Sequence, residues 1–267
     1  MISADMVKDL RDKTGAGMMD CKRALTAANG DMDLAIENLR KSGAAKAEKK
    51  VGRATNNGKV LSAIDGKSAA LVEVLCETDF AANTDKFINF VNGIAAAAAK
   101  LAKNGDVAEL VNENEKANLT EKIATIGENM QIRRVITWQT AGALASYHHM
   151  GGRVSVLIDV EGETDPEVLN DICLHIAAFK PSFITPADVP AEVVAKEKEI
   201  ALAADPKLAG KPAEMIEKIL VGKINKYFGE VCLMNQPWIR DDKTTLAKIK
   251  PSLKVNRFIR WEVGEEL

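Results

Sequence analysis

The side chains best suited to metal or redox chemistry are few in this chain and lie far apart. Among 267 residues there are four cysteines and three histidines, and successive cysteines are at least 55 positions apart. His148 and His149 are adjacent, which excludes the i, i+4 spacing of a helical zinc pair, and His175 has no cysteine or histidine directly beside it. We therefore expect neither a metal site nor a redox pair, and we expect the thiols to be reduced and mostly buried.

Motifs for phosphate binding or nucleophilic catalysis are also missing from the sequence. The chain contains no GxxxxGK[ST] loop, GxGxxG turn, HExxH pair or GxSxG turn, and the TGAG stretch at Thr14 is too short to hold a phosphate. Acidic residues are spread over faces expected to be exposed, so no carboxylate pair stands out for acid–base chemistry. The residues favour a binding or regulatory protein. An unrecognised hydrolase is the weakest alternative, because no nucleophile–base pair is visible.

Composition indicates a folded protein without a general attraction to nucleic acid or membranes. Hydrophobic residues make up 46% of the chain and charged residues 28%, and 36 Lys and Arg against 38 Asp and Glu leave a formal net charge of −2. No run of 18 apolar residues occurs, and the N-terminus lacks a signal-peptide pattern. Because alanine is abundant and aromatic residues are only 4%, we expect a cytoplasmic α+β protein rich in helix.

The first 40 residues predict three short helices. Ser3 is a candidate N-cap, Thr14–Gly17 ends the first helix, and the second covers about Met18–Ala28. After a break at Asn29–Asp31, apolar residues recur at the i, i+3, i+4, i+7 spacing of one helix face. A unit of this size is near the lower limit for independent folding and indicates a docking module, which with its linker covers residues 1–52.

A basic segment follows the third predicted helix. Residues 40–59 carry seven basic residues and one acidic residue and end in an Asn-Asn-Gly turn signal. We interpret this segment as a charged linker, formed by a solvated helix end and a hinge. The alternative is contact with nucleic acid, which would make the protein a ribosome- or RNA-associated adaptor whose binding weakens steeply with salt. No interleaved aromatic residues support base stacking.

Residues 53–140 predict a first lobe of strands and helices. Two β-type runs, Val60–Ile64 and Ala70–Cys76, flank the turn signal Asp65-Gly66-Lys67 and predict a hairpin. In the second run alternate apolar residues share one face, and Glu73 is expected on the opposite face. The remaining predicted elements are helices at about Asp85–Lys103 and Glu113–Ile126 and a strand at Asn129–Thr137.

Residues 141–267 predict a second lobe with the same strand-then-helix order, a coarse repeat that makes an internal duplication plausible. Alternation predicts strands at Val154–Val160 and Val255–Val263, and a helix carries apolar residues from Leu169 to Ile176. Two further helices, about Ala191–Ala204 and Ala213–Phe228, predict an antiparallel helical hairpin inserted at about 187–228. Because its apolar stripe is narrow, the pair is expected to project and to serve assembly.

Several long segments resemble the bacterial elongation factor Ts family. The N-terminal opening of the family is similar to LRDKTGAGMMDCKRAL (Leu10–Leu25) and NGDMDLAIENLRKSG (Asn29–Gly43). Its central signature resembles CETDFAANTDKF (Cys76–Phe87), and its second recurring segment resembles IGENMQIRR (Ile126–Arg134). The stretches KPSFITPADVPAEVVAKE and FIRWEVGE extend the resemblance over essentially the whole chain.

The resemblance implies a guanine-nucleotide exchange factor for elongation factor Tu, the GTPase that delivers aminoacyl-tRNA to the ribosome. It implies action by binding, with no cofactor and no direct nucleotide binding. It also implies an N-terminal UBA-like helical module, a core of two subdomains and a helical hairpin through which a homodimer could form. Family members often end in a short C-terminal helix, and since this chain ends at Leu267, the resemblance implies that most or all of that helix is missing.

The resemblance also assigns residues to the partner-binding surface. Asp79 and Phe80 are expected to wedge near the magnesium and phosphate site of the GTPase, whereas His148 has no counterpart in the family pattern. The expected partner-binding residues are Arg11, Met18, Met19, Lys22, Thr78, Asp79, Phe80, Gly127 and His149. Considered without the resemblance, these residues leave alternatives open, because Met18 or Met19 could pack inside the module and Phe80 could belong to the core of the first lobe.

Overall fold

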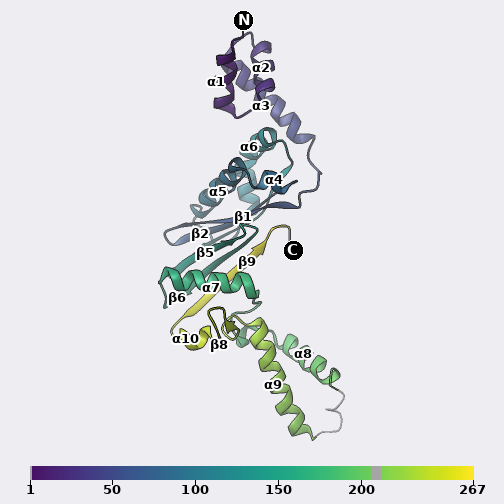
Figure 1. Ribbon diagram of the computed structural model, residues 1–267, viewed down its shortest axis with the longest axis vertical. Coiled ribbons are helices and arrows are strands. Elements are labelled where there is room, and N and C mark those ends of the chain that lie inside the picture. Colours follow the sequence, from purple (N-terminus) through teal and green to yellow (C-terminus); the bar gives the residue numbers. More distant parts are fainter. Residues whose placement is uncertain (1, 206–211) are drawn as a thin grey trace. The chain divides into compact units, whose positions relative to one another are not determined.

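The computed structural model describes residues 2–205 and 212–267 (Figure 1). The chain divides into two compact units. The first unit contains the chain up to Gln139 together with residues 148–155 and 261–267, and the second contains residues 140–147 and 156–260. Helices and antiparallel strands occur in the same chain, which confirms the predicted α+β class. No helix in the described ranges is long and apolar enough to cross a membrane.

Three helices form the N-terminal module, namely α1 (Ala4–Thr14), α2 (Met18–Ala27) and α3 (Met32–Glu48). The Ser3 hydroxyl accepts a hydrogen bond from the Met6 N–H at 3.2 Å and caps α1, and Asp31 caps α3 through the Leu34 N–H at 2.9 Å. Gly15 ends α1 with a φ of 66°, a conformation that favours glycine. The module has its own core, which includes Val7, Leu10, Cys21, Leu25 and Ala35.

The third helix is longer than the apolar spacing indicates. It continues from Arg40 to Glu48, through the first half of the basic segment, because alanine, lysine and glutamate in this stretch favour helix. Ala47, near the end of α3, packs in the hydrophobic cluster formed by the buried strand and helix residues of the first unit, outside the core of the module. The basic segment is therefore partly an ordered helix that packs on its neighbours.

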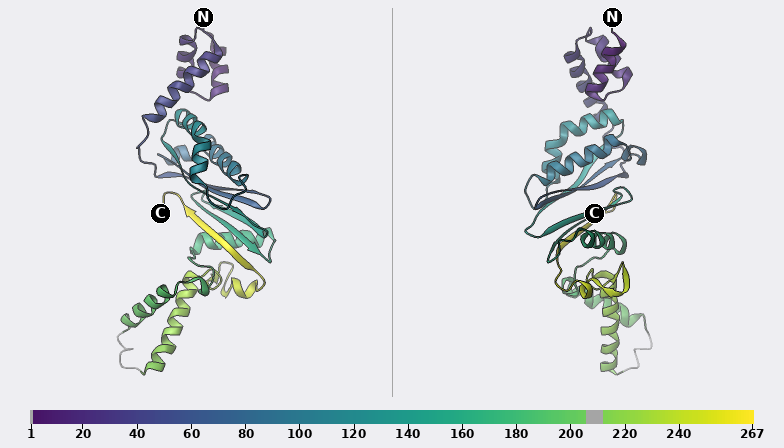
Figure 2. Two further views of the ribbon diagram at one scale, coloured as in Figure 1. Left: turned by 180° about the vertical axis from the view of Figure 1, so that it is seen from behind. Right: turned by 60° about the vertical axis from the view of Figure 1, so that its left-hand side comes forward.

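A four-stranded antiparallel sheet with strand order β1-β2-β4-β3 forms the centre of the first unit. Its strands are β1 (Asn57–Asp65), β2 (Ser68–Cys76), β3 (Gly105–Asp106) and β4 (Met130–Gln139). Asp65 pairs with Ser68, which leaves a two-residue turn and confirms the predicted hairpin. Two helices, α5 (Asp85–Ala99) and α6 (Ala108–Ile126), cover one face of this sheet (Figures 1 and 2).

Glu73 lies on the face of β2 opposite the alternating apolar residues, as expected, and this second face is buried as well. Glu73 is fully buried, and its carboxylate accepts hydrogen bonds from Arg133 and Arg134 on β4 and from the Gly264 N–H. The Arg134 guanidinium also lies 4.3 Å from the ring centroid of Trp261. Alternation within β2 does not reveal this burial, because the covering residues 261–267 come from the other end of the sequence.

Three strands that pair in the order β5-β6-β9 contribute most of their residues to the second unit. They are β5 (Ala143–His149), β6 (Val154–Glu161) and β9 (Lys254–Glu262). Helix α7 (Pro166–Phe179) lies beside these strands (Figures 1 and 2), with Leu169, Ile172 and Ile176 buried. The shorter elements of this unit are the 3-10 helix η1 (Pro186–Asp188), β7 (Pro237–Trp238), β8 (Asp241–Thr245) and α10 (Leu246–Ile249).

The helices α8 (Ala191–Ala203) and α9 (Ala213–Val231) contact each other as a pair. The Lys223 ammonium on α9 donates to the Ala201 carbonyl on α8 at 3.1 Å. Along these two helices, Ile224 is the buried side chain among those described, which agrees with the narrow apolar stripe. The expected connection of the helical hairpin at residues 206–211 lies outside the described residues.

Candidate functional site

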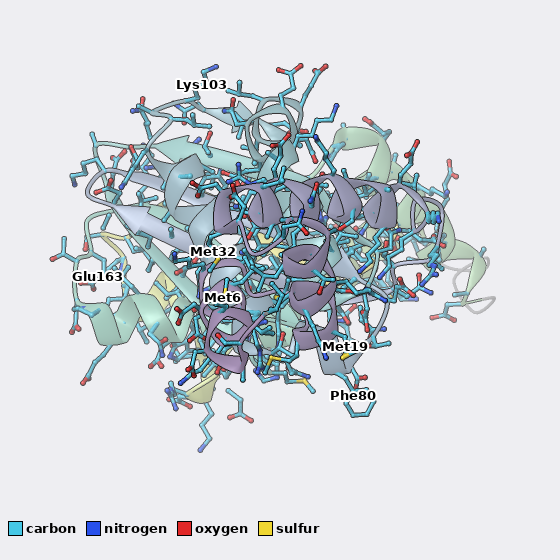
Figure 3. All side chains as sticks on the ribbon, turned by 90° about the horizontal axis from the view of Figure 1, so that it is seen from above. Met6, Met19, Met32, Phe80, Lys103 and Glu163 are labelled. Carbon is cyan, nitrogen blue, oxygen red and sulfur yellow. The ribbon has the colours of Figure 1, made fainter. Side chains whose placement is uncertain are left out.

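Phe80 stands almost free of the protein surface, with 83% of its surface exposed (Figure 3). It lies in α4 (Asp79–Ala82), a single helical turn just after β2, and the preceding residue Thr78 caps this turn by accepting the Ala81 N–H at 3.2 Å. Ala81 and Ala82 face inward and are buried, whereas Asp79 and Phe80 are exposed. Phe80 is therefore not part of the core of the first unit.

A carboxylate from a distant part of the sequence holds the start of this turn. The Glu128 side chain accepts the Thr78 hydroxyl at 2.6 Å on one oxygen, and on the other it accepts the backbone N–H groups of Thr78 at 2.9 Å and Glu77 at 3.1 Å. In return the Glu77 carboxylate accepts the Asn129 N–H at 2.6 Å, which together with nearby Arg53 holds the pKa of Glu77 below its usual value. Residues 77–78, before the turn, and residues 128–129, after α6, are therefore joined by hydrogen bonds in which each segment provides both donors and acceptors.

The underside and the far end of the turn are also fixed. The Cys76 thiol is buried and donates to the Thr78 carbonyl at 3.2 Å, and burial raises its pKa to about 12. The Lys59 ammonium, on a residue only 6% exposed, donates to the Asn83 side chain at 2.7 Å just after the turn. Burial lowers the pKa of this lysine. The buried groups around the turn thus act as supports, and the protonated Cys76 is unsuited to nucleophilic chemistry.

Gly127 lies next to the supporting carboxylate. It ends α6 with a φ of 91°, and its carbonyl accepts a hydrogen bond from the Lys50 ammonium. Arg53 pairs with Glu77 at 3.5 Å, and its carbonyl accepts the Asn129 side-chain amide at 2.8 Å. Together with Lys59, at least three basic groups of the segment 40–59 are thus engaged within the chain, which weighs against that segment as a free nucleic-acid contact.

The adjacent histidines point in different directions at the end of β5. His149 is exposed, and its carbonyl accepts the Gly152 and Arg153 N–H groups, both at 3.1 Å. His148 is half-buried between Ser62 and Ser155, at 3.2 Å and 2.8 Å from their hydroxyls, and burial lowers its pKa. The exposed His149 is the histidine that is expected to face the partner, whereas His148 packs against residues of the protein itself.

The four expected residues of the module lie on its surface. On α2, Met18 and Met19 are 47% and 66% exposed, and Lys22 follows on the same helix face three and four positions later. Arg11 is exposed on α1. Neither methionine is buried in the core of the module, so together they offer an adaptable apolar contact flanked by positive charge.

Sequence reasoning missed the residues that support the turn, chiefly Glu128, Glu77 and Asn129. Within IGENMQIRR the resemblance assigns a partner contact to Gly127, although the next residue, Glu128, carries the supporting carboxylate. Nothing in the local pattern pairs residue 78 with residue 128. Among the described residues, no group of three or more His, Cys, Asp or Glu side chains has the arrangement needed to hold a metal ion.

Comparison with known proteins identifies the family of this chain. The family model "Elongation factor TS" matches residues 77–265. Elongation factor Ts of Thioalkalivibrio sulfidiphilus is 46% identical over 275 residues, and that of Colwellia psychrerythraea is 48% identical over 266 residues; each alignment covers 99% of this chain and 92% of the relative. The chain belongs to the elongation factor Ts family. It functions as a guanine-nucleotide exchange factor for elongation factor Tu in translation elongation.

Proposed function

We propose that the turn Asp79–Ala82 promotes GDP release by inserting Phe80 into the GTPase domain of elongation factor Tu. The observation that supports this role is an aromatic side chain 83% exposed on a turn that is hydrogen-bonded at both ends and underneath. Inserting an aromatic side chain from a mobile segment would cost conformational entropy on binding. Because the backbone of this turn is already fixed, that cost is smaller. Asp79 brings a negative charge beside the inserted ring, toward the metal and phosphate site of the partner.

The remaining contacts come from the other partner-binding residues. Exchange requires that the factor and the nucleotide weaken each other's affinity for the GTPase by one common factor. A 10⁴-fold effect corresponds to about 5.5 kcal/mol of difference between two states, and burying one phenylalanine provides about 1.5–3 kcal/mol. Phe80 therefore needs help from Thr78, Gly127 and His149 in the core. Arg11, Met18, Met19 and Lys22 of the module would add docking energy.

In this proposal the protein has no active site and does not bind GDP or GTP itself. The support comes from the sequence, which lacks a phosphate-binding loop. Isothermal titration of the purified chain with GDP and GTP tests this. We expect no heat of binding, and micromolar affinity for either nucleotide would contradict the mechanism. We also assign the protein to the cytoplasm, because it belongs to a family of translation factors.

A homodimer through the helices α8 and α9 is a second part of the proposal. Ile200, Leu202, Met215 and Val221 on this pair are 41–52% exposed, and a second copy of the helix pair would cover these apolar side chains. Sedimentation equilibrium of the wild type and of an Ile200→Glu, Val221→Glu variant tests the idea. A dimer that dissociates in the variant is expected, with Glu192→Lys on the same helix pair as control. A monomeric wild type at high micromolar concentration would exclude it.

The decisive experiment on the function is release of fluorescent GDP from elongation factor Tu, measured with and without this protein. The protein should accelerate release catalytically, at concentrations below that of the GTPase. Phe80→Ala should slow the stimulated rate, whereas Val51→Ala, which truncates an apolar side chain 76% exposed, should not. Equal effects of the two substitutions would exclude Phe80 as the inserted group.

A further inference from the structure

Glu128 makes three hydrogen bonds to the residues that begin the exposed turn, although it lies far from them in the sequence. Its two carboxylate oxygens accept three hydrogen bonds from Glu77 and Thr78, 50 and 51 positions earlier in the chain. The shortest of these, 2.6 Å from the Thr78 hydroxyl, has the length of a charge-assisted hydrogen bond. Glu128 is itself only partly exposed.

The Thr78 hydroxyl links the carboxylate to the turn. It donates its single proton to Glu128 and accepts the Ala81 N–H at 3.2 Å, so both of its functions are used. By accepting the Ala81 N–H, the Thr78 hydroxyl caps the N-terminus of α4, the helical turn that carries Phe80. Orientation therefore passes from Glu128 to Thr78 and from Thr78 to the helical turn.

We propose that Glu128 is a positioning residue for nucleotide exchange, which sets the direction of Phe80 by holding Thr78 and the Glu77–Thr78 backbone. This inference rests on the proposed role of Phe80. Glu128 reaches the GTPase through these groups rather than by contact of its own. Because Glu77 in turn holds the Asn129 N–H at 2.6 Å, the same bonds keep Gly127 in a fixed relation to the turn, and the two expected contacts are presented as one surface.

The chemistry of the site requires a carboxylate. All three partners of Glu128 are donors, and only an ionised carboxylate offers acceptors on both of its terminal atoms. Glutamine has the same shape, but its amide N–H₂ would face either the two backbone N–H groups or the Thr78 hydroxyl. The hydroxyl would then have to turn its proton away from residue 128. Glu128→Gln therefore removes the bonding pattern while leaving the volume unchanged.

The test is a double-mutant cycle on GDP release from elongation factor Tu. Glu128→Gln, Thr78→Val and the double variant are compared with wild type over a range of exchange-factor concentrations, with Glu113→Gln on the exposed surface of α6 as control. We expect Glu128→Gln to lower the maximal stimulated rate roughly tenfold, with less than about a threefold change in the half-saturating concentration. The double variant should be no slower than the slower single variant, because both changes break one chain of bonds.

Phe80→Ala, measured in the same series, separates this inference from the proposed function. If Phe80→Ala is slow but Glu128→Gln has the wild-type rate, the positioning role is wrong and the role of Phe80 stands. If Phe80→Ala also has the wild-type rate, the proposed function fails. Additive losses in the cycle would show that Glu128 acts independently of Thr78 and would overturn the inference.

Thermal melting of each variant tests whether Glu128 has a purely structural role. A lowered melting temperature together with a normal maximal rate per folded molecule would make Glu128 a stabilising residue only. Should Glu128→Gln not fold, two substitutions of Thr78 decide. Thr78→Ser keeps the hydroxyl held by Glu128 and should have the wild-type rate, whereas Thr78→Val removes the hydroxyl, leaves the two backbone bonds to Glu128 in place and should be slow. A normal maximal rate in Thr78→Val would overturn the inference.

Discussion

Arg134 and Glu73 form a buried ion pair in the sheet of the first unit, with 2.5 Å between Nε and a carboxylate oxygen. Arg133 approaches the same carboxylate at 3.3 Å, and both arginines also donate to the C-terminal segment, at the carbonyls of Glu265 and Glu262. The fully buried Glu73 side chain completes the contact by accepting the Gly264 N–H at 2.8 Å. One carboxylate therefore joins two neighbouring strands and the end of the chain.

Replacing Glu73 with alanine should lower the free energy of unfolding by about 3–5 kcal/mol, because two arginines would lose their buried counter-charge. Urea denaturation of the wild type and of Glu73→Ala measures this, with Glu113→Ala at an exposed position of α6 as control. Hydrogen exchange should also become faster in residues 261–267. A loss below about 1 kcal/mol, within the range of ordinary surface changes, would show that the pair contributes little.

Helix caps and the β-hairpin of this fold could be predicted because their signals are local. The Ser3 cap, the break at Asn29–Asp31 and the turn after Asp65 act on residues within four positions, and the corresponding elements begin or end where these signals indicate. The burial of Glu73 could not be predicted, because its covering residues are about 190 positions away. Alternation in a strand shows which residues share a face, but not whether a distant segment covers the second face.

The candidate site shows the same division. The residue types alone left Phe80 equally suited to a core, and the resemblance, not the physical pattern, placed it on the surface. Its 83% exposure follows from Ala81 and Ala82, which fill the inner side of the turn. Glu128 went unrecognised because a glutamate beside a helix end has no local signal for the residue it holds.

Acidification should destabilise the second unit through His175. This side chain is fully buried between Phe179 and Trp238, with ring centroids at 4.7 Å and 5.2 Å, and its Nε2 lies 2.9 Å from the side-chain amide oxygen of Gln236. Its Nδ1 is buried without a hydrogen-bond partner among the described residues. A second proton would therefore have no acceptor, and burial lowers the pKa of His175 despite the opposing hydrogen bond to Gln236.

The sign of the effect follows from proton binding. Because the pKa is lower in the folded state, the unfolded chain binds the proton first as the pH falls through about 6.5. Stability should therefore decrease below that pH, by at most about 1.4 kcal/mol per pH unit for this group. Denaturation at pH 7.5 and 5.5 should show a smaller decrease in His175→Phe than in wild type. Parallel profiles for the two proteins would contradict the prediction.

Deleting residues 1–52 should leave a folded chain that binds elongation factor Tu more weakly. The module has its own core, but Ala47 belongs to the cluster of the sheet and Lys50 contacts Gly127. A matched deletion of residues 1–40 keeps both of these contacts. Circular dichroism should show folded protein for both deletions, and binding should weaken in both because Met18, Met19 and Lys22 are lost. Unfolding of the shorter deletion would show that the module is part of the core.

Phe80→Ala should slow GDP release while leaving the protein folded and able to dock. Since the side chain is 83% exposed, its truncation should change the free energy of unfolding by no more than about 0.5 kcal/mol. Loss of its contact in the open state of the GTPase, about 2 kcal/mol, should reduce the stimulated release rate roughly 30-fold. Affinity for the nucleotide-free GTPase should fall less, because the partner can relax around the smaller side chain and the contacts proposed for Met18, Met19 and His149 are not changed by the substitution. Thermal melting and GDP release on one preparation test both statements, and a large drop in melting temperature with near-normal exchange would mean that Phe80 stabilises the fold and does not act on the nucleotide site.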